Sequence, residues 1–108
     1  MKLDVYLDEE MVPVEIPREV LDNGESFFAK MDEDMARGWK IGPTWVENPD
    51  LEQRAQVAAD RLAVAIETGN KRLASLLAGY IVSRLPGVKA VRIDPNGEPL
   101  NTEFWRGA

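Results

Sequence analysis

The side chains that enzymes most often use for acid–base and nucleophilic chemistry are missing from this sequence. Its 108 residues include no histidine and no cysteine. This removes the commonest general base, the usual metal ligand and the Ser–His and Cys–His nucleophile pairs. Gly38 and Gly42 have neither the spacing of a Walker loop nor that of a dinucleotide-binding loop. The sequence therefore predicts a protein that is not an enzyme and needs no cofactor.

The densest group of possible metal ligands is the run Asp32-Glu33-Asp34. Carboxylate oxygens suit Mg²⁺ and Ca²⁺, so Asp32 and Asp34 are candidate ligands for a divalent cation. Consecutive helical residues point about 100° apart, however, and the three carboxylates cannot converge on one ion unaided. The glycine and glutamate of an EF-hand loop are also missing from the segment. A solvated helix face is the favoured interpretation.

Aromatic residues give a second candidate site, around Trp39 and Trp45. This region is a candidate pocket for a small molecule or, together with Asp32 and Asp34, for a divalent cation. The alternative is that the aromatic residues at helical spacing belong to the core, and that each tryptophan anchors its loop by burying a large area. The core interpretation is favoured.

The charge balance argues against nucleic acid and membrane partners. The chain has 19 acidic and 13 basic residues, a net charge of −6, whereas binding to phosphate or anionic lipid needs a cationic surface. Arg54 and Arg61 share a helix face, but acidic residues lie near them, which favours intramolecular ion pairs. The longest nearly uncharged stretch, 73–83, is about half as long as a helix that crosses a bilayer, so we expect no membrane-spanning helix.

Residues 73–85 are the most informative segment for function. They form a predicted helix that is apolar on most of its circumference, as expected for a helix buried on several sides. Few other elements are available to cover it, so we expect a homodimer through this helix. The alternative is that a helix over 18–39 and a small sheet cover it within one chain. The candidate interface residues are Leu73, Leu77, Tyr80, Ile81 and Arg84.

The first elements that the sequence predicts are two strands near the N-terminus. Apolar residues alternate over 3–7 and again over 12–16, which predicts a hairpin, with Pro13 restricting the second strand to a sheet edge. A helix follows over 18–39, with a break near Asn23-Gly24. The segment 40–47 is predicted to be an ordered connector.

A helical hairpin occupies the centre of the chain. Asn48 is the expected N-cap of its first helix, with Pro49 at the first helical position. Gly69 ends this helix, Asn70 caps the next, and Pro86-Gly87 ends the pair. A strand over 88–93 follows, then a turn at 94–97 and a short strand or surface segment over 98–105.

Together these elements predict one domain, 1–108, of the α+β class. It is mostly helical, with a central antiparallel helical hairpin, a further N-terminal helix and a small antiparallel sheet from the terminal regions. The sequence leaves open whether the N-terminal hairpin and the 88–93 strand share one sheet.

Three segments carry a resemblance to known sequences: 31–39 (MDEDMARGW), 45–49 (WVENP) and 78–88 (AGYIVSRLPGV). They resemble a family of small uncharacterised proteobacterial proteins. The resemblance implies a bacterial protein and transfers no activity, ligand or site residue. No apolar segment follows Lys2, so we expect no secretory signal and a cytoplasmic location.

The leading functional hypothesis from the sequence is a non-catalytic accessory or protein-interaction protein. It would act through a helical surface as a homodimer and bind an unknown protein partner, but neither nucleic acid nor membrane. The alternative hypothesis is a small-molecule or divalent-cation binding protein that uses the Trp39/Trp45 region.

Overall fold

The computed structural model describes residues 1–107 and has an α+β fold, as predicted. Helix makes up 49% and strand 26% of this part of the chain. The elements in chain order are β1 (Lys2–Leu7), β2 (Glu10–Glu15), α1 (Arg18–Asn23), α2 (Glu25–Ala36), β3 (Trp39–Ile41), β4 (Thr44–Val46), α3 (Leu51–Glu67), α4 (Lys71–Arg84), β5 (Val88–Ile93), the 3₁₀ turn η1 (Pro99–Asn101) and β6 (Glu103–Arg106).

The main sheet has the strand order β2-β1-β5-β6, so both terminal regions share one sheet. β1 pairs with β2 and β5 pairs with β6 in antiparallel fashion, but β1 and β5 are parallel, with Val5 opposite Val91. The sheet is therefore mixed, and the prediction of an antiparallel sheet was wrong. Parallel pairing is possible because β1 and β5 are not joined by a hairpin: β2 and all four α-helices of residues 1–107 lie between them in the chain.

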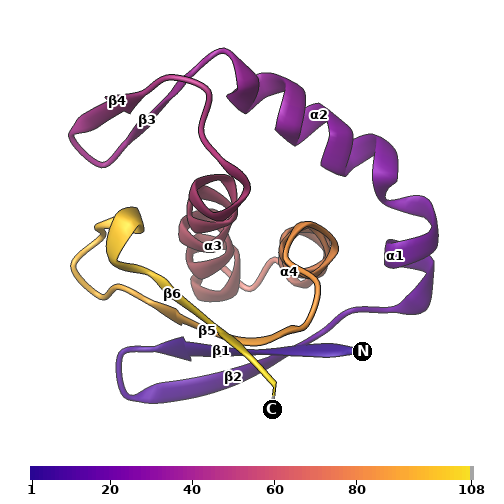
Figure 1. The fold of residues 1–108 in the computed structure, drawn as a ribbon. Helices are drawn as coiled ribbons and strands as arrows, with labels where there is room; N and C mark the ends of the chain where they lie inside the picture. Colours follow the sequence, from indigo (N-terminus) through magenta and orange to yellow (C-terminus); the bar gives the residue numbers. More distant parts are fainter. Residues whose placement is uncertain (108) are drawn as a thin grey trace.

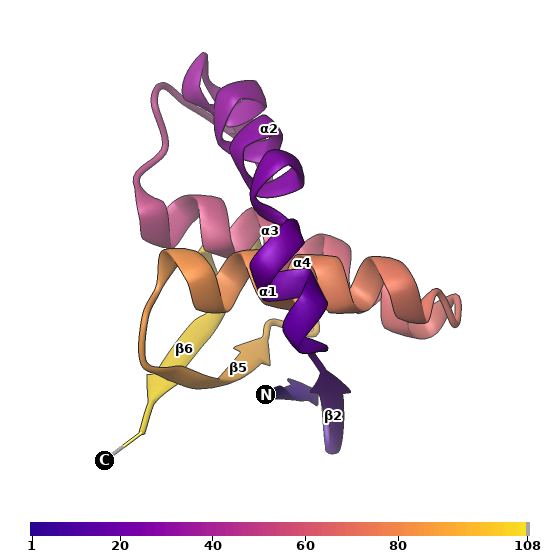
Figure 2. The ribbon, with the colours of Figure 1, turned by 90° about the vertical axis from the view of Figure 1, so that its right-hand side faces the viewer.

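The helices form two layers on one face of this sheet (Figure 1). The α3–α4 hairpin packs directly on the sheet, and α1 and α2 lie over the far side of α4. Figure 2 shows the α1–α2 segment crossing the α3–α4 layer steeply. The hydrophobic core lies between the layers, where Leu3 and Val91 of the sheet and Leu62 and Leu77 of the helices are fully buried.

Helix α4 is buried on several sides, as its composition predicts. The sheet, α3 and the α1–α2 segment together cover it within one chain. Close approach of α1 and α2 depends on Gly79, where a Cβ atom would lie 2.9 Å from Val20 Cγ1 and 3.0 Å from Phe28 Cζ. A larger side chain at this position would push the outer helices away from α4.

Several boundaries differ from the prediction. The 18–39 helix is broken at Gly24, as expected, but it ends at Ala36 because the chain turns at Gly38 into the β3–β4 hairpin, which replaces the predicted connector. The N-cap of α3 is Asp50, not Asn48. The Asp50 carboxylate accepts the Gln53 N–H at 2.8 Å, and the Gln53 side chain accepts the Asp50 N–H at 2.9 Å, completing a capping box.

No helix within residues 1–107 is both long enough and apolar enough to cross a membrane.

Candidate functional site

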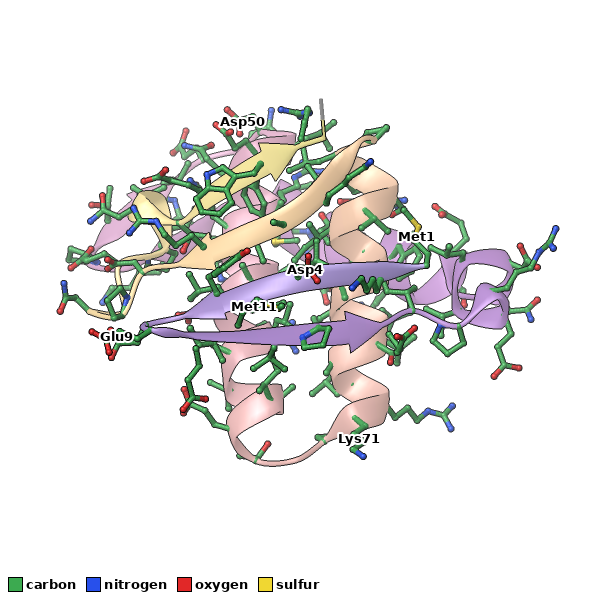
Figure 3. All side chains as sticks on the ribbon, turned by 90° about the horizontal axis from the view of Figure 1, so that it is seen from below. Met1, Asp4, Glu9, Met11, Asp50 and Lys71 are labelled. Carbon is green, nitrogen blue, oxygen red and sulfur yellow. The ribbon has the colours of Figure 1, made fainter. Side chains whose placement is uncertain are left out.

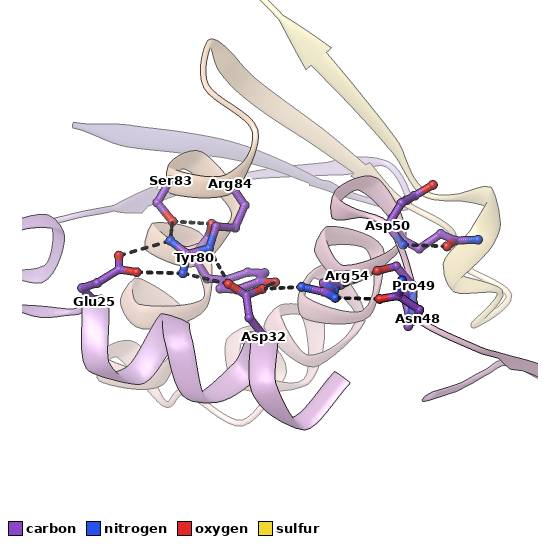
Figure 4. A network of polar contacts seen from close by, with 10 residues as sticks. Glu25, Asp32, Asn48, Pro49, Asp50, Arg54, Tyr80, Ser83 and Arg84 are labelled. Atoms are coloured by element: carbon purple, nitrogen blue, oxygen red, sulfur yellow. Dashed lines mark hydrogen bonds and ion pairs between the residues drawn. The ribbon is translucent and has the colours of Figure 1, made fainter. Parts of the chain in front are cut away.

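A cluster of polar side chains lies between α2 and the helical hairpin, with Asp32 at its centre (Figure 4). The Tyr80 hydroxyl donates to Asp32 Oδ1 at 2.5 Å, and Arg84 Nε donates to Asp32 Oδ2 at 2.8 Å. Arg54 Nη1 donates to Asp32 Oδ1 at 3.4 Å. One carboxylate on α2 therefore binds side chains from both α3 and α4.

The two arginines extend this cluster in opposite directions. Arg84 also donates to both Glu25 oxygens, at 2.9 and 3.2 Å, and its guanidinium lies over the Phe28 ring, 5.7 Å from the centroid. Arg54 donates from Nε to the Pro49 carbonyl at 2.8 Å. The network thus ties the outer helix layer to the segment that leads into α3.

The pKa of Asp32 is lowered by this arrangement. Burial alone would raise the Asp32 pKa, but the hydrogen bonds from Tyr80 and Arg84 and the charges of Arg84 and Arg54 outweigh it. Burial and the Asp32 carboxylate raise the pKa of Tyr80. The hydrogen bond to Glu25 raises the pKa of Arg84, and the same bond lowers the pKa of Glu25. These shifts hold Asp32, Glu25 and Arg84 in their ionised forms and Tyr80 in its neutral form.

The cluster has the properties of a structural element. The Tyr80 side chain is 0% exposed, and both Asp32 oxygens already accept hydrogen bonds from within the chain. Asp34, the second candidate metal ligand, points to Lys30 at 2.9 Å instead. The described residues contain no group of three or more acidic side chains that could hold a metal ion.

The candidate interface residues of α4 are covered by the chain itself. Leu77, Tyr80 and Ile81 are 0% exposed, Leu73 is half-buried, and Arg84 is bound to Asp32 and Glu25. The apolar excess of residues 73–85, which motivated the predicted homodimer, is therefore satisfied within one chain.

The two candidate tryptophans have separate environments. Trp39 is half-buried and lines a cleft. Trp45 is 61% exposed and lies against the backbone of Gly38, where a Cβ atom would come within 2.5 Å of its ring. The expectation that both tryptophans anchor their segment in the core was wrong for Trp45, because its ring packs on the hairpin itself.

The Trp39 cleft lies between α3, the β3–β4 hairpin and the 97–99 loop, and has a volume of about 210 Å³. Val57, Asp60 and Arg61 line it from α3, where their i, i+3, i+4 spacing places them on one face. Asp60 has no hydrogen-bond or ion-pair partner within residues 1–107, and burial raises its pKa. This site was not predicted from the sequence, although the spacing of Val57, Asp60 and Arg61 already places them on one helix face.

The outer face of the main sheet has no helix over it (Figures 1 and 3). Tyr6 of β1 and Trp105 of β6 meet there across β5, with ring centroids 5.3 Å apart. Trp105 is 42% exposed and Met11 of β2 is 47% exposed. This outer face is the largest sheet surface that the described helices leave uncovered.

The two edges of the sheet differ in how they are protected. At the β2 edge, Pro13 has no N–H to offer, and the Glu15 carbonyl accepts a hydrogen bond from the Ser75 hydroxyl at 2.8 Å. At the β6 edge there is no proline, and no described side chain bonds to the backbone of 103–106. The β6 edge is therefore the open one.

Comparison with known proteins gives no match: no family model, curated protein or solved structure is similar to this chain.

Proposed function

We propose that this protein is a non-catalytic interaction protein that binds an extended, acidic segment of another protein along β6 and the adjoining outer face of the sheet. The observation that carries the proposal is the contrast between the two sheet edges: Pro13 and Ser75 partly block β2, and no described side chain blocks β6. The proposed surface differs from the helical one expected from the sequence, because α4 is already covered.

The backbone of β6 supplies the first part of the recognition. Residues of a strand alternate between pairing with one neighbour and pointing away from it, so about half of the N–H and C=O groups in 103–106 face outward. An extended segment that pairs with these groups would add a fifth strand to the sheet. A strand added at β2 would receive no hydrogen bond from Pro13, which has no N–H. It would also compete with the Ser75 hydroxyl for the Glu15 carbonyl.

The outer face supplies apolar contact beside this edge. The exposed Trp105 ring, supported by Tyr6, offers a large rigid surface of the kind enriched at the centre of protein interfaces. On the same face, Asp4 Oδ1 is buried without a hydrogen-bond donor, and only the Lys2 ammonium approaches it, at 3.7 Å. Both features are consistent with a surface that a partner completes.

Charge favours an acidic partner at this edge. β5 and β6 carry three basic residues and one acidic residue, whereas the whole chain has a net charge of −6. Arg92 pairs with Glu103 at 2.5 Å. Lys89 and Arg106 have no acidic partner among residues 1–107, and they remain available to carboxylates of the added strand.

Site-specific photocrosslinking in the native host tests this proposal. A benzophenone amino acid replaces Trp105 in one variant and Met11 in a matched control, because both residues are exposed on the same outer face but lie at opposite edges. We expect a crosslinked protein with the Trp105 variant and little with the Met11 variant. Mass spectrometry of the adduct should place the crosslink in an acidic, extended segment of the partner.

Two further results bear on the proposal. Replacing Lys89 and Arg106 with serine should lower the yield of the Trp105 crosslink and make that yield depend less on salt concentration. An adduct between two copies of this chain would instead identify β6 as a homodimer interface and contradict an acidic partner segment. Equal adducts at both positions, or none at Trp105, would refute the proposed surface.

A further inference from the structure

The cleft beside Trp39 is lined by charged side chains of both signs that form no ion pair with one another within residues 1–107. Trp39 and Ile41 line it from the β3–β4 hairpin, and Val57 lines it from α3. Its volume of about 210 Å³ corresponds to about seven water molecules at roughly 30 Å³ each. A molecule with six or seven non-hydrogen atoms fits such a space.

Asp60, Lys40 and Arg61 form no ion pair with one another in the described part of the chain. Asp60 lines the cleft together with Lys40 and Arg61, but no oxygen of Asp60 lies within 4.0 Å of either cation, since no such ion pair exists within residues 1–107. Lys40 and Arg61 have no other acidic partner in this part of the chain. Partial burial raises the pKa of Asp60. The Glu98 carboxylate reaches the rim at Gly42.

This arrangement discriminates between classes of small molecule. A simple amine would meet the Asp60 carboxylate but would be repelled by Lys40 and Arg61. A simple carboxylate would meet the two cations but would be repelled by Asp60. Only a molecule that carries both charges satisfies all three side chains.

We infer that this cleft is a binding site for a small zwitterion of the amino acid type. Its ammonium group donates to Asp60, its carboxylate accepts from Arg61 and Lys40, and its carbon atoms pack against Trp39 and Val57. The site is independent of the proposed interaction surface, because none of its residues belongs to β6 or to the outer face of the sheet.

The test is calorimetric titration of the full chain with glycine, L-alanine and L-serine, with ethylamine and acetate as single-charge probes. We expect saturable binding of at least one amino acid below about 1 mM, which is within reach of a ligand this small. Ethylamine and acetate should bind at least about tenfold more weakly, because each leaves one charge of the site unpaired. Trp39 fluorescence should change on binding.

Matched variants locate the site. Asp60→Asn should weaken binding about tenfold or more by removing a charged hydrogen-bond acceptor, whereas Glu67→Gln, on the same helix face two turns away, should leave it unchanged. Trp39→Phe should abolish the fluorescence response and Trp45→Phe should keep it. No saturable binding by any of the three amino acids, equal binding of ethylamine, or an unaffected Asp60→Asn variant would overturn the inference.

Discussion

Asp32 and Asp60 are both half-buried aspartates on helices, and the chain surrounds them in opposite ways. Asp32 receives hydrogen bonds from Tyr80 and Arg84 and a weaker one from Arg54. Asp60 receives none within residues 1–107. Accordingly the pKa of Asp32 is lowered and the pKa of Asp60 is raised.

This difference separates a structural cluster from a candidate binding site. Desolvation disfavours both carboxylates, but only at Asp32 does the protein compensate for it. A polar group that accepts hydrogen bonds from its own chain stabilises the fold, whereas one that lines a cleft without such a partner is available to a ligand.

The largest effect is expected for Asp32→Asn. The substitution leaves Arg84 and Tyr80 facing a neutral amide, and we expect a loss of about 2–3 kcal/mol in the free energy of unfolding, less than for a fully buried ion pair because Asp32 is 24% exposed. Urea unfolding followed by circular dichroism measures this loss. Asp34→Asn is the control, since the exposed ion pair with Lys30 contributes about 0.5 kcal/mol or less. Equal effects of the two variants would contradict the structural role of Asp32.

A smaller loss is expected for Tyr80→Phe, which keeps the buried ring and removes only the hydroxyl donor to Asp32. We expect about 1.5–2 kcal/mol, the lower part of the range for a hydrogen bond to a charged group. Tyr6→Phe, on the outer face of the sheet, should change stability by less than about 0.5 kcal/mol. The same unfolding experiment compares the two, and an unchanged midpoint for Tyr80→Phe would show that the hydroxyl does not contribute.

The pH dependence of stability should follow Asp32. Because its folded pKa lies below the unfolded value of about 3.9, its contribution is present above that value and is lost as the pH falls through the folded pKa. Melting temperatures measured between about pH 6 and 2.5 should therefore fall more steeply for the native chain than for Asp32→Asn. Parallel curves would refute a lowered pKa.

The smallest effect on stability is expected for Asp60→Asn. This substitution should stabilise the protein, whereas those at Asp32 and Tyr80 should destabilise it. Because the folded pKa of Asp60 is raised, the ionised carboxylate opposes folding at neutral pH, and the opposition disappears as the pH falls below the unfolded value of about 3.9. We expect the variant to be more stable than the native chain by about 0.5 kcal/mol at pH 7. The two proteins should become equal near pH 3.5, within the accuracy of a thermal melt. A destabilised variant would indicate a partner for Asp60 within the chain.

Local elements of the fold could be predicted from the sequence because their signals are local. Alternating apolar residues identified β1, β2 and β5, and Asn70 was correctly assigned as the cap of α4, where its side chain accepts the Leu73 N–H at 3.1 Å. Pro49 favours Asn48 as the cap of α3, because proline suits the first helical position, but the actual cap is Asp50, two residues further on. β3 and β4 have three residues each, too few to show a period.

Contacts between distant parts of the chain could not be predicted. Asp32 and Tyr80 are 48 residues apart, and no spacing indicates that their helices meet. The parallel pairing of β1 with β5 is likewise invisible to periodicity, and it decides which sheet face and which edge remain open. The sequence therefore suggests separate roles for Asp32, as a metal ligand, and Tyr80, as an interface residue. In the structure the two side chains are hydrogen-bonded to each other.

The most direct test of the contrast is an NMR titration of the side-chain carboxyl groups of Asp32 and Asp60 in one sample, with and without glycine. We expect Asp32 to titrate below and Asp60 above the ordinary value of about 3.9. Glycine should lower the Asp60 pKa and leave Asp32 unchanged. An Asp60 that titrates at or below the ordinary value without glycine would show that the chain already supplies its partner, and would contradict the distinction between the two regions.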